Sequence, residues 1–438
     1  MLRRSIPTPA ILALVYLSWI LIGTTLLWLP ISSVDSLSFN QAFFTSTSAI
    51  TVTGLSVINI GAELTLFGQI ILALLIHLGG MGLMTFAIVI LSSFGMPVTL
   101  SQRRILRDEM GLTTLSGLVD LVWAVFKIVI LCELVGAVLM SFIFVPEFGW
   151  SKGLWNALFH SVSAFNNAGF SLFSDSFMGY HDNPLILLTA ATQFMIGGIG
   201  FIVLTDIAVV KKWRNFSLHT RIMITGTIIL LVSSVLIIGL LEWTNPNTVG
   251  ALPNTAQKIY AVMFEAATPR TAGFNSLDTS ALRDSTALFM MILMVIGGGS
   301  MSTAGGIKVT TAAFLLLATI AFFRNTGRVR AFGYSIGLDQ GLKVMALTTI
   351  SLFIILLGLF VIIATHDFDF LDAAFEVVSA FGTVGLSRGI TGELNLIGEL
   401  VICVIMFLGR IGPLTLGVFM MSKTPPLTKF PEGKIFLG

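Results

Sequence analysis

The sequence predicts an all-α membrane protein with eight transmembrane helices and four re-entrant half-helices, built from four copies of one unit. Three observations support this fold class. The 438 residues are 55% hydrophobic and only 11% charged, with a mean hydropathy of +0.96, whereas soluble domains carry about 25% charged residues. Long apolar runs alternate with shorter mixed stretches. One short glycine motif recurs four times along the chain.

Eight segments are long enough to cross a hydrocarbon layer of about 30 Å as helices. They are residues 9–30, 65–94, 118–146, 184–210, 220–244, 284–323, 341–365 and 394–421. An even number of spans places both termini on one side of the membrane. Lys and Arg are concentrated on that side, as in residues 103–107 and 211–221. The positive-inside rule therefore predicts that both termini are cytoplasmic.

A glycine loop lies between the two spans of each consecutive pair. The four versions are AFFTSTSAITVTGLS (42–56), ALFHSVSAFNNAGFS (157–171), VMFEAATPRTAGFNS (262–276) and AFEVVSAFGTVGLS (374–387). The span that follows each loop carries a second shared patch: GGMG (79–82), GGIG (197–200), GGGS (297–300) and GRIG (409–412). A fixed internal period indicates a repeat architecture. The predicted units are 1–100, 101–215, 216–335 and 336–422, followed by a cytoplasmic tail, 423–438.

The stretch before each loop is predicted to be a half-helix. Suitable N-cap residues precede the apolar turns: Ser38 or Asn40, Ser151, Asn254 or Thr255, and Asp367 or Asp369. Each run has about a dozen residues and is too short to span. A half-helix that enters the membrane and returns leaves irregular backbone at membrane depth. Such backbone is tolerated only where it is buried in protein or lines a watery path.

Backbone carbonyls are the predicted chemistry of these loops. The C-terminal ends of the half-helices carry partial negative charge, and rings of carbonyl oxygens can replace the water shell of a monovalent cation. None of the loops has Asp or Glu between positions −3 and +2 of its glycine, which argues against a divalent-cation site. Four loops around one axis therefore predict a pseudo-fourfold pore suited to K⁺.

The sixth span contains IGGGSMSTAGGIKVTT (296–311), which a straight helix does not accommodate because each glycine costs about 1 kcal/mol relative to alanine. One interpretation is a small-residue packing face. The favoured one is a flexible gating loop at about 297–306. Arg410 replaces the second glycine of the patch, and we expect it to face the interior and to hold this loop. Lys308 either assists or snorkels to the interface. The predicted gate residues are Gly297, Gly298, Gly299, Gly305, Gly306, Lys308 and Arg410.

Polar residues elsewhere in the membrane are predicted to have structural roles. His160, Glu265 and Glu376 occupy one aligned position in three half-helices, with Thr45 as the first-unit equivalent, and we expect them to form hydrogen bonds behind the loops. His77 is predicted to be a hydrogen-bonded structural histidine and not a metal ligand.

These loops and their flanking spans resemble the membrane subunits of the Trk, Ktr and plant HKT proteins, a superfamily of K⁺ transporters. The resemblance covers essentially the whole chain. The short N-terminus and TPRTAGFNS (268–276) most resemble the KtrB-type subunits of bacterial Ktr potassium-uptake systems. The resemblance implies a K⁺ selectivity filter and places the gating loop in the third unit. The implied filter residues are Val52, Thr53, Gly54, Asn167, Ala168, Gly169, Thr271, Ala272, Gly273, Thr383, Val384 and Gly385.

The resemblance also implies partners and a location. They are a homodimer with one pore in each protomer, a cytoplasmic ring of RCK domains of the KtrA type that binds ATP or ADP, and the lipid of a bacterial cytoplasmic (inner) membrane. Ktr systems are often Na⁺-dependent, although no residue here locates a Na⁺ site. The basic linkers and the tail 424–438 are predicted docking surfaces. The sequence has no Walker loop and no GxGxxG after a strand, so we expect no nucleotide on this chain, and nothing indicates a nucleic-acid partner.

Two other classes of function are alternatives to a pore. A secondary cation symporter with a central substrate site usually has two inverted repeats and one or two broken helices. Four units in parallel register favour a pore instead. A membrane-embedded enzyme needs a constellation such as paired carboxylates or HExxH, and the sequence has none. We therefore expect no enzymatic activity.

Overall fold

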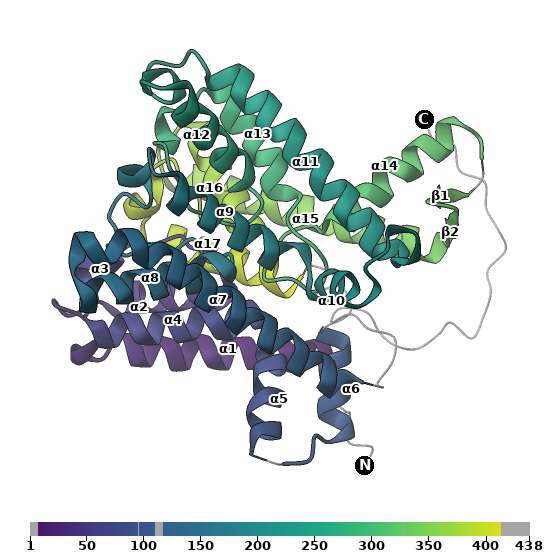
Figure 1. Ribbon diagram of the computed structural model, residues 1–438, viewed down its shortest axis with the longest axis horizontal. Coiled ribbons are helices and arrows are strands. Elements are labelled where there is room, and N and C mark those ends of the chain that lie inside the picture. Colours follow the sequence, from purple (N-terminus) through teal and green to yellow (C-terminus); the bar gives the residue numbers. More distant parts are fainter. Residues whose placement is uncertain (1–7, 95, 110–116, 327, 413–438) are drawn as a thin grey trace.

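The computed structural model describes residues 8–94, 96–109, 117–326 and 328–412, and it is almost entirely helical (Figure 1). Within these residues, four unbroken helices are long and apolar enough to cross a membrane. They are α1 (Thr8–Leu27), α7 (Leu118–Phe148), α11 (Leu218–Glu242) and α15 (Leu338–Thr365). These helices supply the first span of each unit, as predicted.

The second spans of the first three units are interrupted at the glycine patch. Helices α4 (Leu66–Met81) and α5 (Leu83–Ser93) meet at a bend of 104°, and α9 (Pro184–Ile199) and α10 (Phe201–Val210) meet at 94°. The hinge is the last glycine of the patch, with φ of 86° at Gly82 and 107° at Gly200, values that L-residues with a side chain rarely adopt. Each predicted span at 65–94 and 184–210 is therefore a pair of helices joined at a bend, and the sequence did not predict the bend.

In the third unit, α13 (Asp284–Val295) and α14 (Val309–Phe323) are separated by the glycine-rich stretch, so the predicted break of the sixth span is present. In the fourth unit, α17 (Leu396–Ile411) ends at Gly412, whose φ is 90°. Residues 413–421 of the predicted eighth span and the predicted tail 423–438 lie outside the described residues.

The four half-helices are present where the sequence placed them. They are α2 (Phe39–Thr51), α8 (Trp150–Phe165), α12 (Thr255–Ala267) and α16 (Phe370–Gly382). Ser38 caps α2 in a capping box with Gln41, and Asn254 and Asp369 occupy the cap positions of α12 and α16. The α8 cap is Gly149 and not Ser151. The third span continues to Phe148, so that Gly149 alone separates the two helices.

The half-helices close a ring with the spans. The second span of each unit packs against the half-helix of the next, in the pairs α4 with α8, α9 with α12, α13 with α16, and α17 with α2. The last pair joins the fourth unit to the first. The aligned phenylalanines of the half-helices are at most 1% exposed: Phe44, Phe159, Phe264 and Phe375. Apolar burial therefore fixes each half-helix at equivalent depth around one centre.

The remaining elements are short. They are helices α3 (Ile60–Glu63) and α6 (Leu100–Glu109), 3₁₀ turns at Pro30–Ser32, Met178–Tyr180, Trp213–Asn215, Val249–Ala251, Thr279–Ala281 and Ile390–Glu393, and the antiparallel strands β1 (Val329–Ala331) and β2 (Tyr334–Ile336). Figure 1 shows α5 with α6, and α14 with the β-hairpin, as two projections from the helical body.

Candidate ion site and intramembrane loop

The four glycine loops converge on one another. A Cβ atom on Gly54 would lie 2.3 Å from the Ala168 carbonyl oxygen, and one on Gly169 would lie 2.9 Å from the Gly273 Cα. A Cβ on Gly273 would lie 2.2 Å from the Val384 oxygen, and one on Gly385 would lie 2.2 Å from the Thr53 oxygen. Each loop therefore touches the next, and the fourth touches the first. All twelve residues predicted for the filter belong to these converging segments.

Each loop adopts the same unusual backbone conformation. The residue two positions before the glycine has positive φ in all four loops: Val52 (55°), Asn167 (58°), Thr271 (71°) and Thr383 (49°). The glycines follow with φ of 95°, 67°, 78° and 93°. Positive φ is disfavoured for β-branched residues, and such strain persists where the surrounding structure imposes it, commonly at functional sites.

Hydroxyl side chains of the half-helices hold the loops. Ser48 Oγ accepts a hydrogen bond from the Gly54 amide at 3.0 Å, and Ser379 Oγ accepts one from the Gly385 amide at 3.1 Å. Ser163 Oγ donates to the Phe170 carbonyl at 2.7 Å, and Thr268 Oγ1 donates to the Phe274 carbonyl. Sequence reasoning missed these four residues. The signal was available, because a hydroxyl stands six residues before the glycine in three units and five before it in the third.

The predicted hydrogen bonds behind the loops are confirmed in three units. His160 Nε2 accepts from the Leu172 amide at 3.2 Å, Glu265 Oε1 accepts from the Ser276 amide at 2.8 Å, and Glu376 Oε2 accepts from the Ser387 hydroxyl at 2.7 Å. Each bond restrains the residue two or three positions after the shared glycine. The first unit differs, since the Thr45 hydroxyl has no partner among the described residues.

A cavity opens onto the ring of loops. Its volume is about 490 Å³, and all four glycines, Gly54, Gly169, Gly273 and Gly385, line it. Two carboxylates, Glu63 and Asp175, are also part of its lining. An ion in this cavity would thus meet the four loops at once, with negative charge nearby.

The segment between α13 and α14 lies against the converging loops. It is anchored by the Gly299 amide, which donates to the Gly198 carbonyl at 2.7 Å, and by the Phe201 amide, which donates to the Met301 carbonyl at 2.7 Å. Thr303 Oγ1 donates to Asn167 Oδ1 at 2.8 Å. A Cβ on Gly305 would lie 2.1 Å from Thr383 Oγ1. The segment therefore contacts the loops of the second and fourth units.

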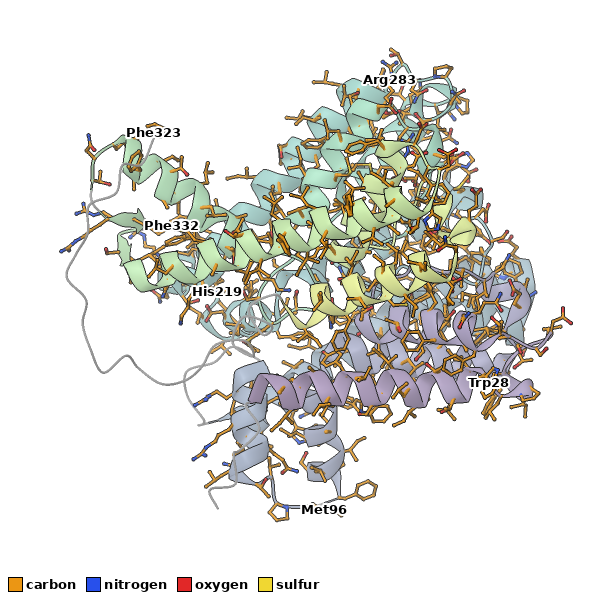
Figure 2. The ribbon with its side chains drawn as sticks, turned by 180° about the vertical axis from the view of Figure 1, so that it is seen from behind. Trp28, Met96, His219, Arg283, Phe323 and Phe332 are labelled. Carbon is orange, nitrogen blue, oxygen red and sulfur yellow. The ribbon has the colours of Figure 1, made fainter. Side chains whose placement is uncertain are left out.

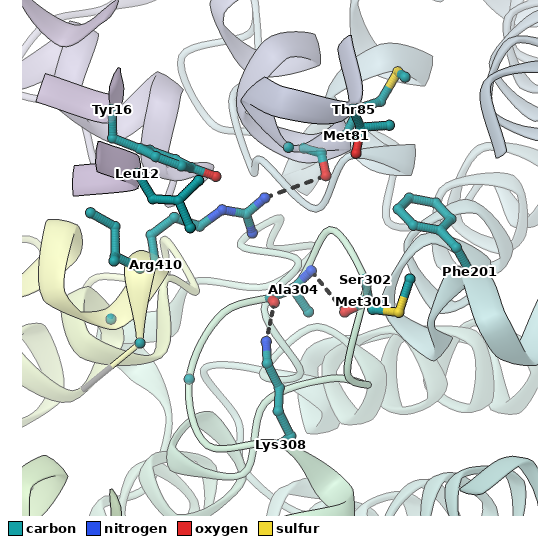
Figure 3. A pocket seen from close by; sticks show the side chains of 16 residues that line it. Leu12, Tyr16, Met81, Thr85, Phe201, Met301, Ser302, Ala304, Lys308 and Arg410 are labelled. Atoms are coloured by element: carbon teal, nitrogen blue, oxygen red, sulfur yellow. Dashed lines mark hydrogen bonds between the residues drawn. The ribbon is translucent and has the colours of Figure 1, made fainter. Parts of the chain in front are cut away.

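Two cations hold this segment and line a second cavity of about 230 Å³ beside it (Figure 3). Arg410 donates to the Thr303 carbonyl and to the Gly79 and Gly80 carbonyls near the end of α4. A cation is favoured at a helix C-terminus. Lys308 Nζ donates to the Ala304 carbonyl at 2.6 Å, so the lysine bonds within the segment. Neither cation forms an ion pair within the described part of the chain.

A buried polar cluster joins the first two units. His77 Nδ1 lies 3.1 Å from Glu133 Oε1, and Asn166 Nδ2 donates to the same oxygen at 2.8 Å. His77 is thus a hydrogen-bonded structural histidine, as predicted. A Cβ on Gly80 would lie 2.1 Å from Asn166 Oδ1, which places this cluster directly behind the carbonyl that Arg410 binds.

The spans and the closed ring of backbone loops together define a multi-pass membrane protein built around a candidate cation path. Residues 10–428 match the TrkH family, described as "Cation transport protein", and the chain belongs to this family. The expected family is therefore confirmed.

Relatives agree with this assignment, and a solved structure has the same fold. The chain is 44% identical to the Ktr system potassium uptake protein B of Bacillus subtilis, over 98% of this chain and 96% of that protein. It is 41% identical to the protein of the same name from Vibrio alginolyticus, over 98% and 95%. It is 34% identical to the potassium/sodium uptake protein NtpJ of Enterococcus hirae, over 100% and 98%. The crystal structure of the potassium transporter TrkH from Vibrio parahaemolyticus superposes with a TM-score of 0.75 at 21% identity, over 96% and 86% of the two chains.

Proposed function

We propose that this protein takes up K⁺ across the cytoplasmic membrane of a bacterium, and that the four converging loops are its selectivity filter. The proposal assigns the ion-coordinating carbonyls to the residues named in each loop: Val52, Thr53 and Gly54; Asn167, Ala168 and Gly169; Thr271, Ala272 and Gly273; Thr383, Val384 and Gly385. The observation that carries it is the ring closure, in which each loop touches the next and Gly385 returns to Thr53.

The chemistry of the loops supports K⁺ as the ion. Backbone carbonyls can replace the hydration shell of K⁺, and a carboxylate cage of the kind that binds Ca²⁺ is not present in the loops. The named relatives take up potassium, or potassium and sodium. With one glycine kept in each loop, we expect only moderate discrimination of K⁺ from Na⁺. We also propose that uptake depends on Na⁺.

The segment 297–306 is proposed to be the gate. Its contacts with Asn167 and Thr383 support the proposal that it blocks an ion leaving the loops. Arg410 and Lys308 are proposed to hold the blocking position through the carbonyls that they bind. An unpaired cation beside the path also repels K⁺. Opening then requires the segment to leave these carbonyls.

Regulation is proposed to come from a separate subunit. Two relatives are named protein B of a Ktr system, and this name supports a further component. We propose a KtrA-type ring of RCK domains that binds ATP or ADP, a homodimer of this chain, and both termini in the cytoplasm. The unit boundaries at 100, 215, 335 and 422 remain part of the proposal.

Uptake in a K⁺-uptake-deficient bacterial strain tests the function. Expression of the chain together with a KtrA-type partner should restore growth at low external K⁺, and Gly385→Ser should lower the preference for ⁴²K⁺ over ²²Na⁺. Gly389→Ser is the matched control, because Gly389 also has positive φ (107°) but no atom within 4 Å of its added Cβ. Unchanged ion preference in a well-expressed Gly385→Ser protein would contradict the filter assignment.

A further inference from the structure

Two basic segments that lie more than a hundred residues apart in the chain meet at one face of the molecule. The first follows α10 and reads KKWR (211–214). The second runs from the end of α14 into the β-hairpin. The two are joined by an aromatic contact, in which the rings of Trp213 and Phe332 lie edge to face with centroids 6.4 Å apart. Figure 2 shows Phe332 on the projection formed by α14 and the hairpin, with Phe323 near its tip.

The cations of this face are exposed to the surroundings of the protein. They are Lys211, Lys212, Arg214, Arg324, Arg328 and Arg330, all on the exposed surface. None of them forms an ion pair within the described residues. The nearby carboxylate of Asp206 is occupied by hydrogen bonds from the Thr220 hydroxyl, at 2.6 Å, and the Ser217 amide, at 3.2 Å. We call these six residues with Trp213 and Phe332 the basic aromatic face.

The hairpin holds Phe332 in place against its conformational preference. Phe332 and Gly333 form the two-residue turn between β1 and β2, with φ of 50° and 84°. Turns of this kind favour Asn or Asp at the first position, and a bulky residue with positive φ is uncommon. Placing a phenylalanine there puts its ring against Trp213, so the turn connects the two basic segments.

The basic aromatic face begins where apolar surface ends. Helix α14 is apolar along its whole length, VTTAAFLLLATIAFF, and Leu316, Phe322 and Phe323 are 64%, 77% and 78% exposed. A helix that is hydrophobic all round belongs in lipid or in a protein core. Arg324 follows at once, just as Lys211 follows the apolar α10. Cations and a tryptophan next to lipid-facing helices mark the headgroup level of a bilayer.

We propose that the basic aromatic face binds the headgroup of an anionic phospholipid of the cytoplasmic leaflet, and that the bound lipid stabilises the intramembrane segment in its blocking position. The phosphate would meet the guanidinium groups, which suit its geometry. The acyl chain would lie along α14, where a cavity of about 280 Å³ is lined by Phe314, Leu317 and Ile336. The continuous apolar surface favours a lipid over an acidic protein partner.

The route from this face to the gate consists of two short helices. Helix α10 starts at Phe201, whose amide donates to the Met301 carbonyl of the intramembrane segment, and it ends at Val210, beside Lys211. Helix α14 starts at Val309, whose amide donates to the Gly298 carbonyl at 3.1 Å, and it ends beside Arg324. A lipid that fixes the far ends of both helices therefore restrains the segment at their near ends. This coupling rests on the proposed function, whereas the lipid site itself does not.

Trp213 provides a direct binding readout. The full chain is placed in nanodiscs that contain bromine-labelled phosphatidylglycerol or bromine-labelled phosphatidylcholine. The emission of Trp213 is obtained by subtracting the emission of the Trp213→Phe protein from that of the unchanged protein. We expect phosphatidylglycerol to quench Trp213 preferentially. Arg328→Gln with Arg330→Gln should weaken this preference by about fivefold for each charge removed. The control pair Lys152→Gln and Arg283→Gln, exposed residues in the first turn of α8 and just before α13, should leave the preference unchanged.

Several results would overturn the lipid site. Equal quenching by both lipids would do so, as would an equal loss of preference in both double variants. Full competition by soluble glycerophosphate would show a free-anion site instead. If the Arg328→Gln/Arg330→Gln protein no longer binds a KtrA-type ring but is quenched by the lipids as before, the face is a protein-docking surface.

Rubidium flux in the same lipids tests the coupling. In vesicles that contain phosphatidylglycerol, the Arg328→Gln/Arg330→Gln protein should carry several-fold more ⁸⁶Rb⁺ than the control pair, and in phosphatidylcholine vesicles the two should be equal. Equal flux in both lipids, with quenching intact, would refute the coupling and leave the transport function standing. If no lipid supports flux, the proposed function fails, while the quenching experiment still decides the lipid site.

Discussion

Alanine substitution at the four shared glycines should produce effects of unequal size, although the four positions are equivalent in the sequence. The reason lies in the neighbouring loop that each new methyl group would meet. At Gly54, Gly273 and Gly385, the added Cβ would fall 2.3, 2.2 and 2.2 Å from a carbonyl oxygen of the next loop. At Gly169, the nearest atoms are the Gly273 Cα at 2.9 Å and the Ala272 oxygen at 3.0 Å.

These distances give the order of magnitude of the expected loss of selectivity. Ordinary contact begins at 3.4 Å, so a carbonyl oxygen must retreat by about 1 Å at three positions and by about half as much at Gly169. Overpacking of this kind costs typically about 1–3 kcal/mol. If about 2 kcal/mol is lost from the preference for K⁺, selectivity over Na⁺ falls roughly thirtyfold. Gly54 and Gly385 also have φ of 95° and 93°, outside the left-handed region that alanine can adopt, whereas Gly169 at 67° lies within it.

Competition of Na⁺ against ⁸⁶Rb⁺ uptake in proteoliposomes measures this ranking. We expect Gly169→Ala to retain most of the selectivity and the other three variants to lose it. Gly149→Ala is the matched control, since Gly149 has φ of 79° and an added Cβ would meet no atom within 4 Å. Gly54→Ala and Gly385→Ala proteins as selective as Gly149→Ala, or equal impairment of all four filter variants, would rule out contact between the loops as the cause.

Three further predictions concern the neighbours of the loops. Arg410→Gln removes charged hydrogen bonds to the Thr303 and α4 carbonyls, each worth about 1.5–3 kcal/mol. Rubidium flux should therefore rise at least tenfold, and a decrease in a folded protein would contradict the latch. Ser379→Ala leaves the Gly385 amide without its side-chain partner and should reduce ion selectivity severalfold in the competition assay, whereas Ser233→Ala, whose hydroxyl bonds only its own helix, should not. Glu133→Gln weakens the contact with His77 and should lower the midpoint of thermal unfolding, and an unchanged midpoint would refute a structural role.

The sequence alone was sufficient to predict the local features of the fold, including those that recur in each unit. Matching flanks around each glycine predicted the half-helices, and the caps Ser38, Asn254 and Asp369 agree with the structure. Five glycines between Ile296 and Thr311 correctly predicted the break in the sixth span. In each case the signal is local, because propensity and capping act within a few residues.

The features that the sequence did not reveal depend on contacts between units. The bends at Gly82 and Gly200 were missed because a glycine in a membrane helix equally indicates close packing. The pairing of His77 with Glu133 joins residues of different units, and no spacing rule connects them. The contact of Trp213 with Phe332 likewise depends on the hairpin, whose short strands carry little periodicity.

Anomalous scattering from crystals soaked in Rb⁺ would locate the bound ion directly. A filter formed by the four loops predicts Rb⁺ on their common axis, within coordinating distance of the carbonyl oxygens of Thr53, Ala168, Ala272 and Val384. Gly385→Ala should weaken this anomalous peak. Rubidium bound elsewhere in the membrane region, with none between the loops, would show that the four loops are not the filter.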